Sequence, residues 1–133
     1  MTINVTVDAA AATGARSLTV TNVDKGTATL ASGLTVNAGP TVTSTTPSAL
    51  GRGASAQTMT IVGTGFVAGA TVSVAATGVT LGTATITATQ ITIPVTVSAT
   101  ATLGAANVTI TNPDAGTIVV TGGLTIVAAQ TIT

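Results

Sequence analysis

The sequence predicts an all-β protein with a β-sandwich architecture. Residues 57–74 contain two runs of alternating apolar and polar residues, joined by a corner with the pattern Gly-x-Gly-Phe that ends at Phe66. Alternation with a period of two is typical of strands that bury one face, and two such runs around a glycine-rich corner indicate neighbouring strands of a sandwich. Threonine supplies about a quarter of the chain. Together with valine and isoleucine it is β-branched and favours a pleated sheet.

The central region of the chain, residues 41–126, is expected to form three strands in its first half. Thr41–Thr46 ends at Pro47, which has no backbone N–H to donate to a sheet. The loop that follows leads to Gln57–Val62, whose apolar residues we expect to point inward. Beyond the corner, the alternation resumes over Thr71–Ala76.

The second half is expected to supply four more strands and one hairpin turn. The turn is Asn112–Gly116, because Asn, Pro, Asp and Gly favour turn conformations. Pro94 removes a hydrogen-bond donor from its strand, so we expect that strand to lie at a sheet edge or to contain a bulge. The four strands are Val79–Ile86, Gln90–Ser98, Ala106–Thr111 and Thr117–Ile126. We expect the first of these to be interrupted at Gly82 and the last to have a bulge near Gly122 and Gly123.

The chain of 133 residues has three basic and three acidic side chains, and its formal net charge is zero. Nucleic-acid binding needs a basic patch that displaces counterions from phosphates, and three scattered cations cannot form one. The mean hydropathy is +0.72. Polar residues nevertheless interrupt every apolar run before about 18 residues, so we expect no membrane insertion. The charged residues are Asp8, Arg16, Asp24, Lys25, Arg52 and Asp114.

The side chains that usually carry catalysis are missing or isolated. The sequence has no cysteine and no histidine, which excludes disulfides, thiolate metal sites and serine–histidine catalysis. Asp24 and Asp114 occupy equivalent positions in two repeated segments of the chain, 90 residues apart. We therefore do not expect them to form the carboxylate pair that acid–base catalysis requires. We therefore predict a protein that is not an enzyme and has no cofactor.

The sequence repeats itself when residues 1–43 are aligned without gaps against residues 91–133. The matches include an Asn-x-Asp-x-Gly pattern, at 22–26 and 112–116, and a Gly-Leu-Thr triplet, at 33–35 and 123–125. Self-similarity at a fixed period is the signature of a repeat protein, so we expect tandem units of about 90 residues.

This repeat predicts three segments. Residues 1–40 correspond to the last strands of one unit, residues 41–126 form a complete unit, and residues 127–133 are a linker and the first strand of a following unit. The first segment brings too few strands to enclose a core by itself. We expect it to be completed either by a preceding part of its own chain or by strands of a neighbouring subunit.

Four segments resemble the IPT/TIG family of immunoglobulin-like domains: Pro40–Pro47 (PTVTSTTP), Thr58–Val72 (TMTIVGTGFVAGATV), Ala88–Val95 (ATQITIPV) and Val108–Gly116 (VTITNPDAG). The corner and the turn are the most specific motifs, whereas Leu50 and Arg52 depart from the Ser/Gly-rich loop of the family. The resemblance implies an immunoglobulin-like, early-set β-sandwich, common as tandem modules in bacterial surface and secreted proteins. Relatives also occur in transcription factors, which the shortage of basic residues argues against, and as accessory modules of carbohydrate-active enzymes.

The two Asn-x-Asp-x-Gly motifs are the only repeated acidic positions. Alternating oxygen ligands before a glycine resemble the start of a calcium loop. The alternative is a hairpin turn in which Gly26 and Gly116 adopt positive φ. We favour the turn, because calcium takes about six to eight oxygen ligands and the chain has no glutamate to supply a bidentate one. The weak metal candidates are Asn22, Asp24, Asn112 and Asp114.

The predicted function is structural. Low charge, threonine-rich faces, the tandem period and an incomplete unit favour a module of an extracellular or cell-surface repeat protein, such as a surface layer, a filament or an adhesin stalk. The expected partners are copies of the protein or adjacent repeats of the same chain, associating through strand edges. The expected location is extracellular: the cell surface, a secreted protein or a virion surface.

The alternative function is a carbohydrate- or receptor-binding accessory module of a secreted enzyme, adhesin or virion, with a surface glycan as its partner. It predicts one binding site at an end of the sandwich, formed by the loops Ser48–Ala54 and Val67–Ala70. Phe66 is the only aromatic residue. Because sugar platforms usually expose several aromatic rings, we expect Phe66 to belong to the core.

Overall fold

The computed structural model describes residues 1–8 and 10–130. Within these ranges the secondary structure consists of eleven strands without a helix, which confirms the all-β class. No helix that is long and apolar enough to span a membrane is therefore present there. The chain divides into two compact units, Met1–Ala38 and Gly39–Thr133.

The first unit holds one antiparallel hairpin of two strands, β1 (Gly14–Thr21) and β2 (Thr27–Val36). The pairing has one register shift, between Arg16 and Leu18. The turn-forming residues between the strands and the β-branched residues within them account for the hairpin. Nearly every residue of both strands is exposed, so this unit encloses no core of its own.

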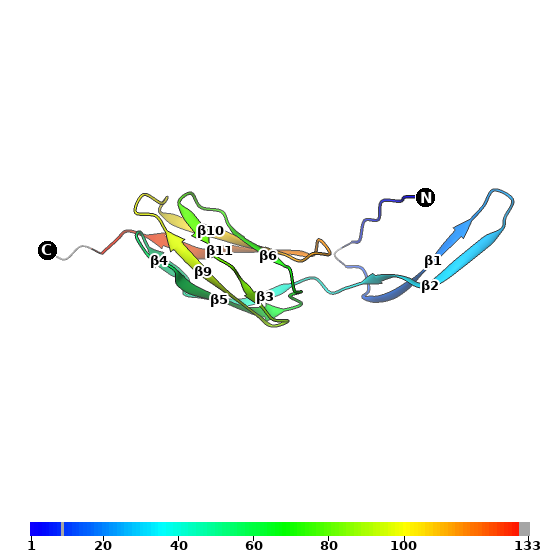
Figure 1. Cartoon of the computed structure of the whole chain (residues 1–133), viewed down its shortest axis with the longest axis horizontal. Helices are drawn as coiled ribbons and strands as arrows, with labels where there is room; N and C mark the ends of the chain where they lie inside the picture. The colour runs from blue at the N-terminus through cyan, green and yellow to red at the C-terminus, as the bar shows by residue number, and fades with distance from the viewer. Residues whose placement is uncertain (9, 131–133) are drawn as a thin grey trace. The chain divides into compact units, whose positions relative to one another are not determined.

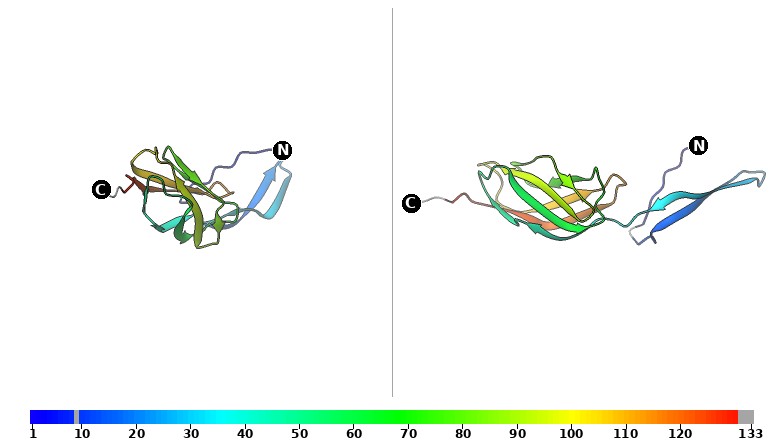
Figure 2. Two further views of the ribbon diagram at one scale, coloured as in Figure 1. Left: turned by 60° about the vertical axis from the view of Figure 1, so that its left-hand side comes forward. Right: turned by 60° about the horizontal axis from the view of Figure 1, so that its bottom comes forward.

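The second unit is a sandwich of two sheets, whose layers can be followed in Figures 1 and 2. One sheet has the order β3-β5-β9-β7, with the short β8 also pairing with β9, and the other has the order β4-β11-β10-β6. Neighbouring strands are antiparallel except for β4 and β11, which are parallel. The strands are β3 (Thr41–Thr46), β4 (Ala49–Gly51), β5 (Gln57–Thr64), β6 (Thr71–Val74), β7 (Val79–Leu81), β8 (Thr85–Ile86), β9 (Gln90–Val97), β10 (Gly104–Thr111) and β11 (Thr117–Val127).

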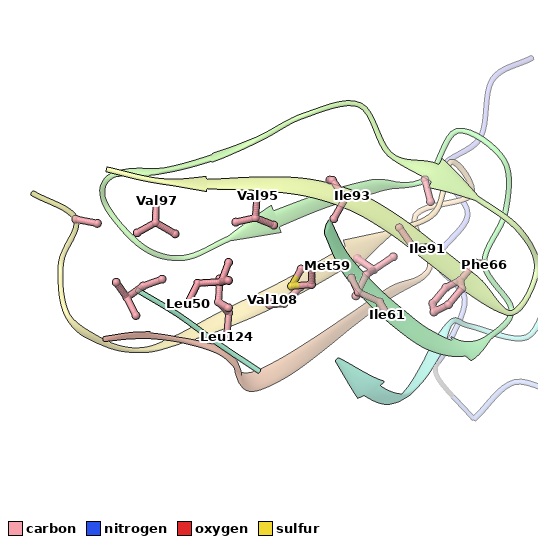
Figure 3. Packing of buried hydrophobic residues seen from close by; sticks show 14 residues of the cluster. Leu50, Met59, Ile61, Phe66, Ile91, Ile93, Val95, Val97, Val108 and Leu124 are labelled. Atoms are coloured by element: carbon pink, nitrogen blue, oxygen red, sulfur yellow. The ribbon is translucent and has the colours of Figure 1, made fainter. Parts of the chain in front are cut away.

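The core lies between these two sheets (Figure 3). In β5, β9 and β10, buried residues alternate with more exposed ones, as the sequence pattern predicts. Burying each large aliphatic side chain contributes about 1.5–3 kcal/mol of transfer free energy. The largest fully buried side chains are Met59, Ile61, Ile91, Ile110, Leu124, Ile126, Val95, Val97 and Val108.

Two glycines at the end of β5 allow the predicted corner to form against β3. A Cβ at Gly63 would lie 1.9 Å from the backbone oxygen of Thr41 and 2.7 Å from the ring of Phe66. Gly65 has a φ of 72°, and a Cβ there would lie 2.9 Å from the Gly39 oxygen. Glycine avoids both clashes and adopts positive φ without strain, so the corner can deliver the Phe66 ring to the core.

Pro94 lies in β9, which is an inner strand of its sheet, so the expected edge position is wrong. Its pairing with Thr58 of β5 is regular, without a bulge. On the other side of β9, the partner is interrupted between β7 and β8, where the Gly82 N–H donates to the Pro94 carbonyl at 2.8 Å. The N–H and carbonyl of one strand residue point to the same side. The donor that Pro94 lacks therefore faces this interruption.

The other predicted strands agree with the structure to within a few residues. β3 has the predicted bounds, whereas β6 ends at Val74 instead of Ala76 and β10 begins at Gly104 instead of Ala106. The sequence does not predict β4, because three residues show no periodicity. This strand is defined by its parallel pairing with Thr125–Val127 of β11.

Candidate functional site

The Asn-x-Asp-x-Gly motifs form the turns of two hairpins with the same geometry. In the first unit, the Asn22 N–H donates to the Gly26 carbonyl at 2.8 Å, and the Asn22 carbonyl accepts from the Lys25 N–H at 3.0 Å. In the second unit, the Asn112 N–H donates to the Gly116 carbonyl at 2.8 Å, and the Asn112 carbonyl accepts from the Ala115 N–H at 3.0 Å. In each turn the aspartate Oδ1 accepts from the glycine N–H, at 3.0 and 3.1 Å. Both motifs therefore stabilise hairpin turns.

The left-handed residue of each turn is not the glycine. Lys25 and Ala115 both have a φ of 68°, whereas Gly26 and Gly116 are not among the residues with positive φ, so that expectation is wrong. The hydrogen bonds and the single left-handed residue match a common three-residue hairpin connection, a type I turn followed by one left-handed residue. The glycine comes next and is crowded, since an added Cβ would lie 3.2 or 3.1 Å from the aspartate Oδ1.

Asn112 joins its turn to the Gly-x-Gly-Phe corner. Its amide nitrogen donates to the Gly65 carbonyl at 2.7 Å, and its amide oxygen accepts from the Val67 N–H at 3.2 Å. Asn112 is 3% exposed and is the one buried polar residue among those the structure describes. Asn22, at the same position of the first unit, is exposed. The sequence assigns both asparagines to turns, and only the packing of the second unit gives Asn112 this additional role.

Oxygen atoms of both motifs are bonded to N–H groups of the protein itself. These are Oδ1 of Asn112 and Oδ1 of both aspartates. Asn22 and Asp24 lie in the first unit and Asn112 and Asp114 in the second, so each turn contains one carboxylate. Over residues 1–8 and 10–130, no group of three or more His, Cys, Asp or Glu side chains could hold a metal ion. The geometry therefore favours the turn interpretation.

The two loops that we expected to form one binding site lie at opposite ends of the sandwich. The first loop contains β4, which pairs with Thr125–Val127 at the end of β11. The second loop, Val67–Ala70, lies beside the turn that precedes β11, because the Val67 N–H donates to the Asn112 side chain of that turn. Leu50 and Phe66, one from each region, lie far apart along the core (Figure 3). The expected joint site is therefore wrong, and the carbohydrate- or receptor-binding role stays a prediction without a site.

Besides the two turn aspartates, three charged side chains bond to the backbone. Arg52 Nε donates to the Ala101 carbonyl at 2.7 Å in a half-buried position, a contact that the sequence does not predict because the partner lies in a distant loop. Arg16 donates to the carbonyl of the residue before it at 3.1 Å, and Asp8 Oδ1 accepts from the N–H two residues on at 2.8 Å. None of these bonds pairs two titratable groups for acid–base chemistry.

The β1/β2 hairpin presents an apolar face that is largely exposed. We define the open hairpin face as Leu18, Val20, Leu30 and Leu34. The residues at the same positions of the second unit belong to its core or pack against it: Val108, Ile110, Val120 and Leu124. For example, Leu18 is 40% exposed and Val108 is 0% exposed. The 90-residue offset is the sequence signal that identifies this face, once the core of the second unit is known.

Both outer edges of this hairpin are also open within the described residues, because its sheet has two strands only. In the second unit the equivalent edges are paired, β10 with β6 and β11 with β4. Unpaired strand edges present rows of N–H and carbonyl groups that can pair with another chain.

The chain matches no protein-family model, no curated protein and no solved structure. The open hairpin face and the two outer edges are therefore the candidate functional site on structural grounds alone. Chemically, they can bury apolar surface and form backbone hydrogen bonds with another sheet.

Proposed function

We propose that this protein is a non-enzymatic structural module of an extracellular or cell-surface repeat protein, such as a surface layer, a filament or an adhesin stalk, that self-associates through strand edges. The observation that carries the proposal is that one hairpin occurs twice. Every Cα pair of β1 and β2 recurs in β10 and β11 at an offset of 90 residues, including the register shift. Positive φ angles recur as well, at Lys25 and Ala115 and at Ser32 and Gly122.

The strand order of the second unit supports an immunoglobulin-like tandem module. When the short strands β4 and β8 are left out and the others are lettered A to G along the chain, β3-β5-β9-β7 has the order A-B-E-D and β11-β10-β6 has the order G-F-C. This is the order of an immunoglobulin-like sandwich, an architecture that many cell-surface domains share. With the corner and turn motifs, it supports the resemblance to the IPT/TIG family and to its surface-exposed tandem members.

Self-association would use the outer edges of β1 and β2. In β10, the Asn107 carbonyl accepts from the Ala75 N–H beside β6 at 2.9 Å. The backbone N–H and carbonyl of Asn107, and of every second residue along the strand, therefore point away from β11 toward the outer edge of the hairpin. The equivalent outward positions of β1 are Ser17, Thr19 and Thr21. None of these three residues is charged or a proline. Native proteins often place such residues on edge strands to prevent pairing with another chain.

A proline in this edge tests the self-association. Thr19→Pro removes an outward N–H without removing a backbone hydrogen bond of the hairpin, and it also removes the bond between the Thr19 and Thr29 hydroxyls, at 2.9 Å. The control is Val23→Pro, since the equivalent residue of the second unit is already Pro113. We expect sedimentation velocity to show concentration-dependent association of the native chain, weakened at least about tenfold by Thr19→Pro and unchanged by the control. A native chain that stays monomeric up to millimolar concentration would contradict the proposal.

Labelling of intact cells tests the location. An antibody against residues 39–130 should label the surface of intact source cells, or material shed from them. Labelling that requires permeabilised cells would contradict an extracellular role.

A further inference from the structure

We propose that the open hairpin face is a docking surface for one further sheet, formed by a repeat segment with the pattern of residues 41–90. This inference rests on the proposed repeat organisation. In the second unit the sheet β3-β5-β9-β7 covers the equivalent face, and Val108 and Leu124 lie in the shared core (Figure 3). The first hairpin has the same pairing, the same bulge and apolar residues at the same positions. Its face is therefore shaped for a sheet of the same kind.

The N-terminal residues have the sequence pattern of one strand of that missing sheet. At the 90-residue offset, Ile3, Val5 and Val7 correspond to three inward residues of β9, which are buried. Ile3, Val5 and Val7 are each at least half exposed, and residues 1–8 contain no strand. In the second unit β9 is held between β5 and β7. The occupant of the face must therefore provide the counterparts of β3 to β8, which is the content of residues 41–90.

A second copy of these 133 residues cannot cover the face by exchanging its sheet. Each copy contains one such sheet and two hairpins that fit it, β1/β2 and β10/β11. Any exchange between copies leaves one hairpin face open per copy. The β10/β11 hairpin also competes intramolecularly, with the advantage of effective concentration. The occupant is therefore a repeat segment additional to the one described.

The size of the first unit agrees with this assignment. Met1–Ala38 is below the size of about 40 residues at which a domain usually folds without disulfides, metals or association. The chain has no cysteine with which to form disulfides. Over the described residues no cluster of three or more His, Cys, Asp or Glu side chains could hold a metal ion either, so association with a further polypeptide segment is the remaining means of enclosing a core around the open hairpin face.

A tandem chain tests the docking surface. Residues 41–90 are copied ahead of Met1, so that Gln90 precedes Met1 as it precedes Ile91 in the native sequence. Amide hydrogen exchange is then followed by mass spectrometry over residues 1–36 in the native and tandem chains. We expect exchange in this region to slow by at least about 100-fold in the tandem chain, approaching that of residues 91–126, because local opening then requires unfolding of a closed unit.

Two substitutions separate docking from a general effect of the longer chain. In the tandem chain, Leu18→Asp places a charge in the open hairpin face and should remove the gained protection. Val23→Asp lies in the turn, where Val23 is fully exposed, and should leave the protection unchanged. A tandem chain that exchanges as fast as the native chain overturns the proposal. So does a chain without the copied segment that carries Thr19→Pro, which weakens edge association, if its residues 1–36 still become protected at high concentration, since the occupant of the face would then be a second copy. Cell labelling is independent of these results, so failure of the docking surface and failure of the proposed location are distinguishable.

Discussion

Replacing Asn112 with alanine tests whether the corner and the turn are locked together as the structure shows. The substitution removes a donor to the Gly65 carbonyl, at 2.7 Å, and an acceptor for the Val67 N–H, at 3.2 Å. Leaving a buried polar group without its partner costs about 1–3 kcal/mol. The Val67 side of this pair is more exposed, so we expect a total loss of about 3 kcal/mol in the free energy of unfolding of the second unit.

Urea unfolding followed by far-ultraviolet circular dichroism measures this loss. With a urea dependence of about 1.5 kcal/mol per molar, the midpoint should fall by about 2 M while the slope stays constant. Asn22→Ala is the matched control, because it removes the same side chain from the equivalent turn of the first unit, at an exposed position. It should change the free energy of unfolding by no more than about 0.5 kcal/mol.

Asn112→Asp makes the test sharper. The aspartate keeps an acceptor for Val67 but presents a second oxygen to the Gly65 carbonyl, so it should destabilise the unit at least as much as alanine does. Equal midpoints for Asn112→Ala and Asn22→Ala, or a neutral Asn112→Asp, would refute the reasoning.

Three further substitutions test other features of the second unit by the same urea unfolding. Gly63→Ala places a Cβ 1.9 Å from a backbone oxygen and should cost more than about 3 kcal/mol, whereas a Cβ at Gly39 meets nothing within 4 Å, and alanine there should be nearly neutral. Equal effects at the two glycines would contradict the corner geometry. Ala115→Gly should add about 1 kcal/mol, because Ala115 has a φ of 68°, and a loss of stability would argue against a left-handed residue there. Thr45→Val removes a hydrogen bond from Oγ1 to the Gly123 carbonyl, at 2.7 Å, and should cost about 1 kcal/mol; an unchanged midpoint would show that this link between β3 and β11 is unimportant.

Features encoded by neighbouring residues could be predicted from the sequence. Alternation sets which side chains of β5, β9 and β10 face the core, because successive residues of a strand point to opposite faces. Glycines set the corner at Phe66, and the Asn-x-Asp-x-Gly motifs set the two turns. The repeated residues likewise anticipate two hairpins with one register. All of these depend on backbone preferences and side-chain periods within a few residues of chain.

Features that depend on distant partners were decided only by the tertiary structure. The parallel strand β4, the inner position of Pro94 and the buried role of Asn112 each require a segment far away in sequence. So does the separation of the two loops that we expected to meet. The exposure of Leu18, against the burial of Val108, is the clearest example. The two hairpins share the same local conformation, and a side chain becomes buried only where a second sheet is present to cover it.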